Sequence, residues 1–219
     1  MKKLLPLILL SSALANASII PVDSPNRLVQ DELFPYQWGL LNQGQTLIRE
    51  KDDIHNLPMK GVENKDIGWK NLIGKFAERR PVVAVLDSGV DLSHPELQGN
   101  LWQNVEECGK DPSKDNDGNQ LAGDCNGWNF TEAIDSDAAK DPSDNDGHGT
   151  HISGIIAALN NGSGMVGVTP NALIMPIKVM RDSNSESTVP SSEAFARGII
   201  YAVDNGADVI NMSLGWPRS

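Results

Sequence analysis

Asp87 and His148 are the two residues whose type and setting are best suited to chemistry. Asp87 directly follows an apolar run at 82–86, and His148 directly precedes apolar residues at helical spacing. A carboxylate that orients an imidazole makes that imidazole a general base, able to take a proton from a nucleophile. Each residue also has a purely structural interpretation, because Asp87 could cap a turn and His148 could cap a helix. The pair alone leaves both interpretations open.

His148 and His151 raise a metal-binding alternative, because histidines at i and i+3 share one face of a helix. The helix of a zinc peptidase carries His-Glu-x-x-His, with its histidines at i and i+4. Here Gly149 follows His148, and the spacing is one residue short. The sequence therefore favours the carboxylate–imidazole pair over zinc. We expect His151 to make a hydrogen bond from the helix face.

Three apolar runs predict the strands that position this pair. Residues 81–86 and 172–180 have the nearly continuous apolar character of strands buried on both faces. Residues 209–212 predict a third strand. The polar segment 109–147, rich in Asp, Asn, Gly and Pro, predicts a loop.

Two helices are predicted between these strands. Their apolar residues are Ile152, Ile155, Ile156 and Leu159 in the first, and Phe195, Ile199, Ala202 and Val203 in the second. Alternating strands and helices predict an α/β fold with a parallel sheet, right-handed crossovers and helices on its faces. Because sites in such sheets form beyond the carboxyl ends of the strands, we expect Asp87 and His148 to face one crevice.

Composition bounds the class of protein. A length of 219 residues indicates about one domain. The 29 acidic and 18 basic residues give a net charge of −11, which argues against a nucleic-acid partner because phosphate binding needs clustered Lys and Arg. Ordinary fractions of apolar and charged residues also argue against a disordered tail, collagen or a coiled coil.

Residues 1–17 have the pattern of a secretory signal peptide. Lys2 and Lys3 precede a short apolar run, and Ala15-Asn16-Ala17 forms an A-x-A cleavage pattern. The run is too short to span a bilayer. We therefore expect export to the extracellular space or the periplasm, with no membrane attachment after cleavage. Residues 18–80 would then form an N-terminal extension and the start of the folded domain.

Export changes the interpretation of Cys108 and Cys125. Outside the cytoplasm, two cysteines in one turn-rich stretch favour a disulfide. A metal site is the alternative, and no histidine at metal-ligand spacing supports it.

Four ordered segments resemble the motifs of subtilisin-like serine peptidases. They are the aspartate motif at 82–91 with His-Pro-Glu-Leu at 94–97, the histidine motif at 146–154, and the segments 166–170 and 209–215. The resemblance covers about residues 31–215. It implies a three-layer αβα subtilisin-like fold with a parallel sheet, a monomer, and protein or peptide substrates. It implies an orienting role for Asp87 and a general-base role for His148.

The resemblance also implies further site residues. Ser213, Leu214 and Gly215 match the segment whose backbone lines the substrate groove, where a peptide pairs as an added strand. The opposing edge is expected at 181–191, which lacks the family's usual Gly-x-Gly pattern, so no residue is assigned there.

Calcium is the cofactor that the resemblance implies. Backbone oxygens and one side chain of a loop match a family calcium site, Glu96 stands where the family more often has Asp, and Asp31 resembles the N-terminal ligand of kexin-like relatives. The loop residues are Leu159, Asn161, Ser163 and Met165. Oxygen ligands of this kind suit Ca²⁺. The acidic runs at 115–119 and 135–144 could bind calcium or form solvated loops, and both interpretations stay open.

The family's nucleophile lies in a Gly-Thr-Ser-Met-type motif that does not occur in residues 1–219, and its upstream oxyanion Asn is missing too. We therefore expect 81–219 to be an incomplete catalytic core, truncated at the C-terminus, and the polypeptide alone to be inactive. The alternative is a catalytically inactive, exported calcium-binding protein of the same fold.

Overall fold

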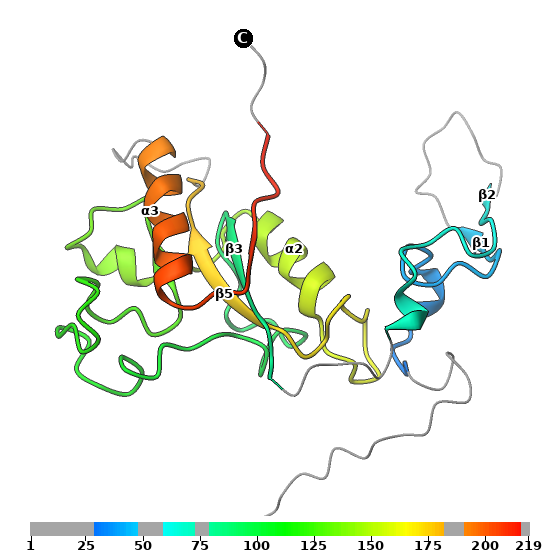
Figure 1. Cartoon of the computed structure of the whole chain (residues 1–219), viewed down its shortest axis with the longest axis horizontal. Coiled ribbons are helices and arrows are strands. Elements are labelled where there is room, and N and C mark those ends of the chain that lie inside the picture. The colour runs from blue at the N-terminus through cyan, green and yellow to red at the C-terminus, as the bar shows by residue number, and fades with distance from the viewer. Residues whose placement is uncertain (1–28, 48–58, 73–78, 182–190, 216–219) are drawn as a thin grey trace, which may run out of the picture.

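The computed structural model describes residues 29–47, 59–72, 79–181 and 191–215 (Figure 1). The predicted signal peptide and most of the predicted groove edge at 181–191 lie outside the described residues. Among the helices that the structure describes, none is both long and apolar enough to cross a membrane.

Four parallel strands form the central sheet in the order β4-β5-β3-β6. They are β3 (Val82–Asp87), β4 (Trp128–Asn129), β5 (Leu173–Lys178) and β6 (Val209–Asn211). β3 pairs with β5 over its whole length, and Asp87 lies opposite Lys178. The three predicted strands are confirmed, and the one richest in apolar residues lies at the centre of the sheet.

Two helices cover opposite faces of this sheet, α2 (His148–Ala157) and α3 (Ser191–Asp204) (Figure 1). The alternation of side chains along β3 separates two cores. Val82, Ala84 and Leu86 belong to the cluster that includes Tyr201 and Ala202 of α3. Val83 and Val85 pack with Ala157, Ile152 and Ile156 of α2. The predicted three-layer αβα architecture is therefore confirmed.

The buried faces of both helices differ in part from the predicted ones: Ile152, Ile156, Phe195 and Ala202 contact the core as predicted, and the other four residues do not. In α2 the buried residues are Gly149, Ser153 and Ala157, whereas Ile155 is 45% exposed and Leu159 lies beyond the helix. In α3 the buried residues are Ala194, Gly198, Tyr201 and Ala202, whereas Ile199 and Val203 are exposed. Periodicity identified the helices and part of each buried face, and it missed the small residues Gly149, Ser153, Ala194 and Gly198 that let each helix approach the sheet closely.

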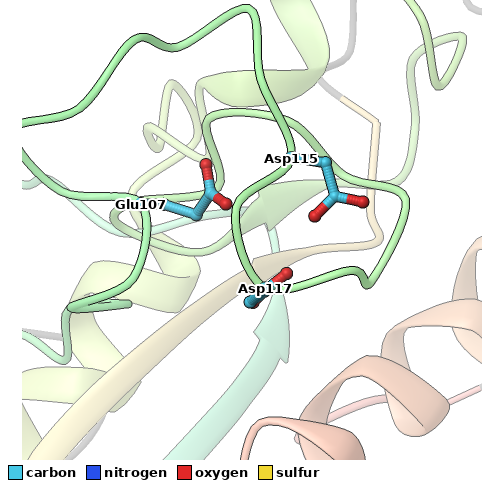
Figure 2. Close-up of side chains that lie close together, drawn as sticks. All are labelled: Glu107, Asp115 and Asp117. Atoms are coloured by element: carbon cyan, nitrogen blue, oxygen red, sulfur yellow. The ribbon is translucent and has the colours of Figure 1, made fainter.

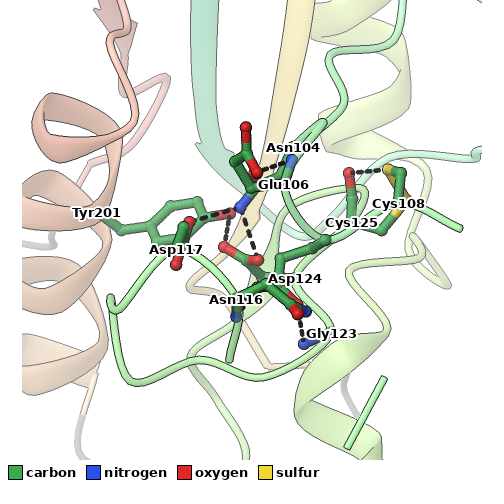
Figure 3. The surroundings of a disulfide bond; sticks show 10 residues. Asn104, Glu106, Cys108, Asn116, Asp117, Gly123, Asp124, Cys125 and Tyr201 are labelled. Atoms are coloured by element: carbon green, nitrogen blue, oxygen red, sulfur yellow. Dashed lines mark hydrogen bonds between the residues drawn. A yellow bond between two sulfur atoms is a disulfide. The ribbon is translucent and has the colours of Figure 1, made fainter. Parts of the chain in front are cut away.

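The segment predicted as a loop at 109–147 contains two short elements, β4 and the 3₁₀ helix η3 (Asp137–Lys140). β4 is only two residues long and pairs Trp128 with Ile177 near the end of β5. Two residues are too few to produce a detectable apolar pattern, so the sequence does not predict this strand. A disulfide joins Cys108 to Cys125, as predicted (Figure 3).

The N-terminal described segment contains η1 (Phe34–Tyr36), the antiparallel pair β1 (Thr46–Leu47) and β2 (Met59–Lys60), and η2 (Trp69–Asn71). Its core includes Phe34 and Trp69 together with Val166. The Trp69 indole N–H donates to the carbonyl of Val168 at 2.7 Å. The N–H of Leu33 donates to Gly164 at 2.9 Å. These contacts attach the N-terminal segment to the loop after α2.

Candidate active site

Asp87 and His148 meet at the carboxyl end of β3. Asp87 is fully buried, and its Oδ1 lies 2.7 Å from Nδ1 of His148, the first residue of α2. The same Oδ1 accepts the N–H of Ser88 at 2.8 Å. The His148 side chain is 43% exposed, so the buried carboxylate holds an imidazole that opens toward solvent. The expectation that the two residues lie close together is met.

This contact determines which proton states the imidazole favours. With Nδ1–H donating to Asp87, Nε2 carries the lone pair and can accept a proton. The hydrogen bond to Asp87 raises the pKa of His148; burial opposes this, and the charges of Asp87, Asp146 and Asp144 add to the increase. A helix N-terminus alone disfavours a cation. The surrounding carboxylates overcome that effect, so the site can stabilise an imidazolium.

Two glycines allow the loop after β3 and the start of α2 to touch. Gly89 has φ +111°, and a β-carbon on it would lie 2.5 Å from the carbonyl oxygen of Pro142. A β-carbon on Gly149 would lie 2.1 Å from the carbonyl oxygen of Gly89. Gly147 has φ +97° and an open surrounding, so it serves the turn that enters the helix. Of the two glycines beside His148, Gly149 therefore allows close packing and Gly147 allows the turn.

The predicted substrate-binding residues follow β6. Since β6 runs parallel to β3, with Asn211 opposite Val85, residues 212–215 lie at the same end of the sheet as Asp87. Ser213 and Gly215 are exposed, and Leu214 is half-buried. The amide of Asn211 donates to the Ser213 hydroxyl at 3.0 Å. Among the described residues, no strand pairs with the outer edge of β6.

The predicted calcium residues come together around the loop after α2. Oδ1 of Asp31 accepts the N–H groups of Asn161 and Gly162 at 3.0 and 2.6 Å. Glu96 lies against the same loop, because its backbone carbonyl accepts the N–H of Leu159 at 3.0 Å.

Each of the two carboxylates keeps one unused oxygen. Oδ2 of Asp31 and Oε2 of Glu96 are buried atoms for which the structure shows no hydrogen-bond partner. Buried oxygens without donors are costly. A hard cation that accepts oxygen ligands would satisfy both, so the residues present fit calcium.

A second acidic group lies in the polar segment before β4. Carboxylate oxygens of Glu107, Asp115 and Asp117 lie within 4.8 Å of one another (Figure 2). Glu107 is buried, and the sequence analysis missed it because it lies eight residues before Asp115 with no regular spacing. Burial raises its pKa, but hydrogen bonds from Asn116 and Gly123 outweigh burial and keep the pKa below its ordinary value. Donors of the loop itself therefore already occupy the carboxylate oxygens of Glu107.

The acidic residues at 135–144 do not form a common site. Asp137 pairs with Lys140 at 2.7 Å, and Asp141 accepts the N–H of Ser143 at 3.0 Å. Asp144 instead contacts the start of α2. The interpretation of this run as a calcium cluster is not supported by its geometry.

The sequence did not predict the buried polar network that lies beside the disulfide (Figure 3). Asp124 is fully buried and accepts hydrogen bonds from the Tyr201 hydroxyl and the Asn104 amide at 2.8 Å, and from the Asn119 amide at 2.9 Å. Burial raises the pKa of Asp124. The network attaches the disulfide-closed loop to α3. An Asp beside a Cys in a polar loop carries no sequence signal for such a role.

Comparisons with known proteins agree with this fold. A model of the subtilase family matches residues 78–219. The cell wall-associated protease of Bacillus subtilis is 33% identical over 199 residues, which cover 89% of this chain and 17% of that protein. The major intracellular serine protease of Bacillus subtilis is 36% identical over 169 residues, covering 75% of this chain and 43% of that protein.

A solved structure extends the likeness to three dimensions. The serine protease of Aeromonas sobria aligns with a TM-score of 0.54 and 26% identity, over 87% of this chain and 26% of that one. The parallel sheet with helices on both faces defines an α/β protein. The chain belongs to the subtilase family, and it spans less than half of the length of the two Bacillus relatives.

Proposed function

We propose that this chain supplies the aspartate and the histidine of the Asp-His-Ser triad of a serine endopeptidase. The observation that carries the proposal is the 2.7 Å contact between a fully buried Asp87 and a half-exposed His148. Fixing Nδ1 as the donor leaves Nε2 as the base that a nucleophilic hydroxyl requires. Protein or peptide chains are the substrates that follow from the family.

In this proposal His148 carries one proton during acylation and one during deacylation, when it takes a proton from the attacking water and returns it to the serine oxygen. During acylation its Nε2 takes the proton of the serine hydroxyl as that oxygen attacks the scissile carbonyl, and it then gives the proton to the leaving amine. Asp87 stays ionised, holds the ring orientation and stabilises the imidazolium. Residues 213–215, exposed beyond β6, are proposed to pair with the substrate as an added strand.

The nucleophile is proposed to come from outside residues 1–219, which contain no Gly-Thr-Ser motif. A serine-directed fluorophosphonate should therefore leave the 219-residue polypeptide unlabelled. A gene product that continues through such a motif should be labelled, and His148→Ala should lower its kcat by roughly three orders of magnitude or more. Specific labelling of the 219-residue chain, or normal turnover by the variant, would refute the assignment.

We also propose that calcium binds at the loop after α2. Asp31, Glu96 and Asn161 would hold the ion with their side chains, and backbone oxygens of Leu159, Ser163 and Met165 would complete the ligand set. Two buried carboxylate oxygens without donors support this proposal. When bound, the ion would supply the positive charge that lets these acids lie close together. Its role would be structural, joining the N-terminal segment to the loop.

Export is the third proposal, and it rests on the sequence of residues 1–17. Cleavage after Ala17 would make Ser18 the first residue of the mature chain. N-terminal sequencing of the protein recovered outside the cytoplasm tests this directly. Recovery of the intact N-terminus from the cytoplasm alone would overturn it.

A further inference from the structure

Five hydrogen bonds converge on the carboxylate of Asp144. Its Oδ1 accepts from the hydroxyl of Ser88 at 2.9 Å and from the backbone N–H groups of Asp146 and Gly147 at 3.0 and 2.9 Å. Its Oδ2 accepts from Thr150 twice, from the N–H at 2.9 Å and from the hydroxyl at 2.6 Å. One side chain therefore links the loop after β3 to the first turn of α2.

Ser88 connects Asp144 to both members of the Asp–His pair. It follows Asp87 directly, and its hydroxyl oxygen also accepts the N–H of Gly149 at 3.0 Å. Gly149 is the residue after His148. Ser88, the residue after Asp87, is thus hydrogen-bonded to the residue after His148, and the carboxylate of Asp144 fixes the Ser88 hydroxyl that makes this link.

Two further contacts hold this arrangement in place. The Thr150 hydroxyl, which donates to the carboxylate, accepts the N–H of Asp91 at 2.9 Å. The buried ammonium of Lys178 donates to the backbone carbonyls of Ser88 and Ser143 at 2.8 and 3.1 Å. These contacts restrain the loop after β3 against the segment that precedes α2.

We propose that Asp144 is a positioning residue that holds the imidazole of His148 in register with Asp87. It acts through its hydrogen bonds to Ser88 and to the first turn of α2. This inference rests on the proposed function, because the orientation of His148 matters for catalysis only if His148 is the base.

The ionised state of Asp144 suits this role. Burial raises its pKa, but the donors on Thr150, Gly147 and Ser88 outweigh burial and hold the pKa below its ordinary value. An asparagine cannot replace it, because both carboxylate oxygens of Asp144 accept hydrogen bonds. The amide nitrogen of an asparagine would carry N–H groups that face the donors to one of these oxygens. Asp144→Asn is therefore a nearly isosteric change that breaks the arrangement.

The charged groups near His148 define the matched control. Asp87 comes from β3, Asp144 and Asp146 precede α2, and the Lys178 ammonium lies at the end of β5. Asp146 is exposed, and its carboxylate raises the pKa of His148 by its charge. Asp146→Asn thus removes a nearby charge while leaving the hydrogen bonds of Asp144 in place.

The test is proton and nitrogen NMR of the 219-residue chain, with the four histidines assigned by His→Gln variants. The unsubstituted chain should show a downfield Nδ1–H signal from His148 that disappears in Asp87→Asn. Asp144→Asn should lose this signal and lower the pKa of His148 more than Asp146→Asn does. Asp146→Asn should keep the signal.

Smaller changes keep the test decisive if Asp144→Asn fails to fold. Ser88→Ala and Thr150→Val each remove one donor to Asp144 and should weaken the signal, whereas Thr150→Ser should retain it. Folded variants that keep the signal and the pKa of the unsubstituted chain would overturn the positioning role. Absence of the signal from the unsubstituted chain would instead refute the Asp–His pair and the proposed function.

Discussion

A β-carbon on Gly149 would lie 2.1 Å from the carbonyl oxygen of Gly89, closer than any two such atoms can approach. Gly149 is buried in the first turn of α2, and Gly89 lies in the loop that follows Asp87. The helix can thus bring His148 to Asp87 only because position 149 carries no side chain. This contact is between backbones, so a change in side-chain rotamer cannot relieve the overlap.

Gly149→Ala should therefore push α2 away from β3 and lower the free energy of unfolding by about 2 kcal/mol or more, the range of overpacked cores. Gly154→Ala is the matched control, because it lies in the same helix with nothing within 4 Å of its added carbon. Removing a helical glycine should stabilise by about 1 kcal/mol. Urea unfolding measures both changes, and equal effects at the two positions would contradict the role of Gly149.

Calcium should stabilise the chain through Asp31 and Glu96. Saturating calcium is expected to raise Tm, with about 2.7 kcal/mol of stabilisation at a hundred times Kd. Asp31→Asn can keep the two hydrogen bonds at Oδ1 while replacing the unused oxygen, so it should lose most of the Tm shift. Exposed Glu32→Gln is the control. If Asp31→Asn keeps the full calcium-dependent Tm shift and Glu107→Gln loses it, the ion binds instead at Glu107, Asp115 and Asp117.

Tyr201→Phe should weaken the attachment of the disulfide-closed loop to α3. The change removes the hydroxyl that donates to buried Asp124 at 2.8 Å and leaves a buried carboxylate with one donor fewer. A cost of about 1–3 kcal/mol in the free energy of unfolding is expected. The other tyrosine, Tyr36, is 52% exposed, so Tyr36→Phe should change stability little. Equal stability of the two variants would mean that the network is not a stabilising contact.

The contribution of His148 to stability should depend on pH in one direction. Its pKa is raised in the folded state, chiefly by the hydrogen bond to Asp87, so the folded protein binds the proton more tightly than the unfolded one. The stabilisation is then fully present below about pH 6.5, the value of a free histidine, and is lost as pH rises through the folded pKa.

His148→Gln should consequently cost more stability at about pH 5.5 than at about pH 9, by the linkage between proton binding and folding. Urea unfolding of both proteins at the two pH values measures the difference. His151→Gln controls for loss of an exposed histidine from the same helix turn. A cost that does not change with pH would contradict the Asp87 contact.

The strands and helices that hold the Asp–His pair could be predicted from the sequence, because apolar runs and helical spacing reflect burial directly. The faces of α2 and α3 could be predicted only in part. Gly149 and Gly198 are buried on these two faces, and a pattern based on hydrophobicity does not select glycine. Glu107 and Asp124 were missed for a related reason. Their partners lie far along the chain or in irregular backbone, so no periodic pattern marks them.

The disulfide between Cys108 and Cys125 brings two Cα atoms to 4.7 Å, at the two ends of a polar loop. Asn104 donates a hydrogen bond to Asp124 beside it, and Tyr201 of α3 donates to the same carboxylate, so this end of the loop is fixed to the rest of the protein. A loop with its ends fixed can lengthen or shorten at low cost. Evolution can therefore rewrite the exposed residues 111–118 between the cysteines, and an engineer could graft a new segment there, while the distance from β3 to α2 stays the same.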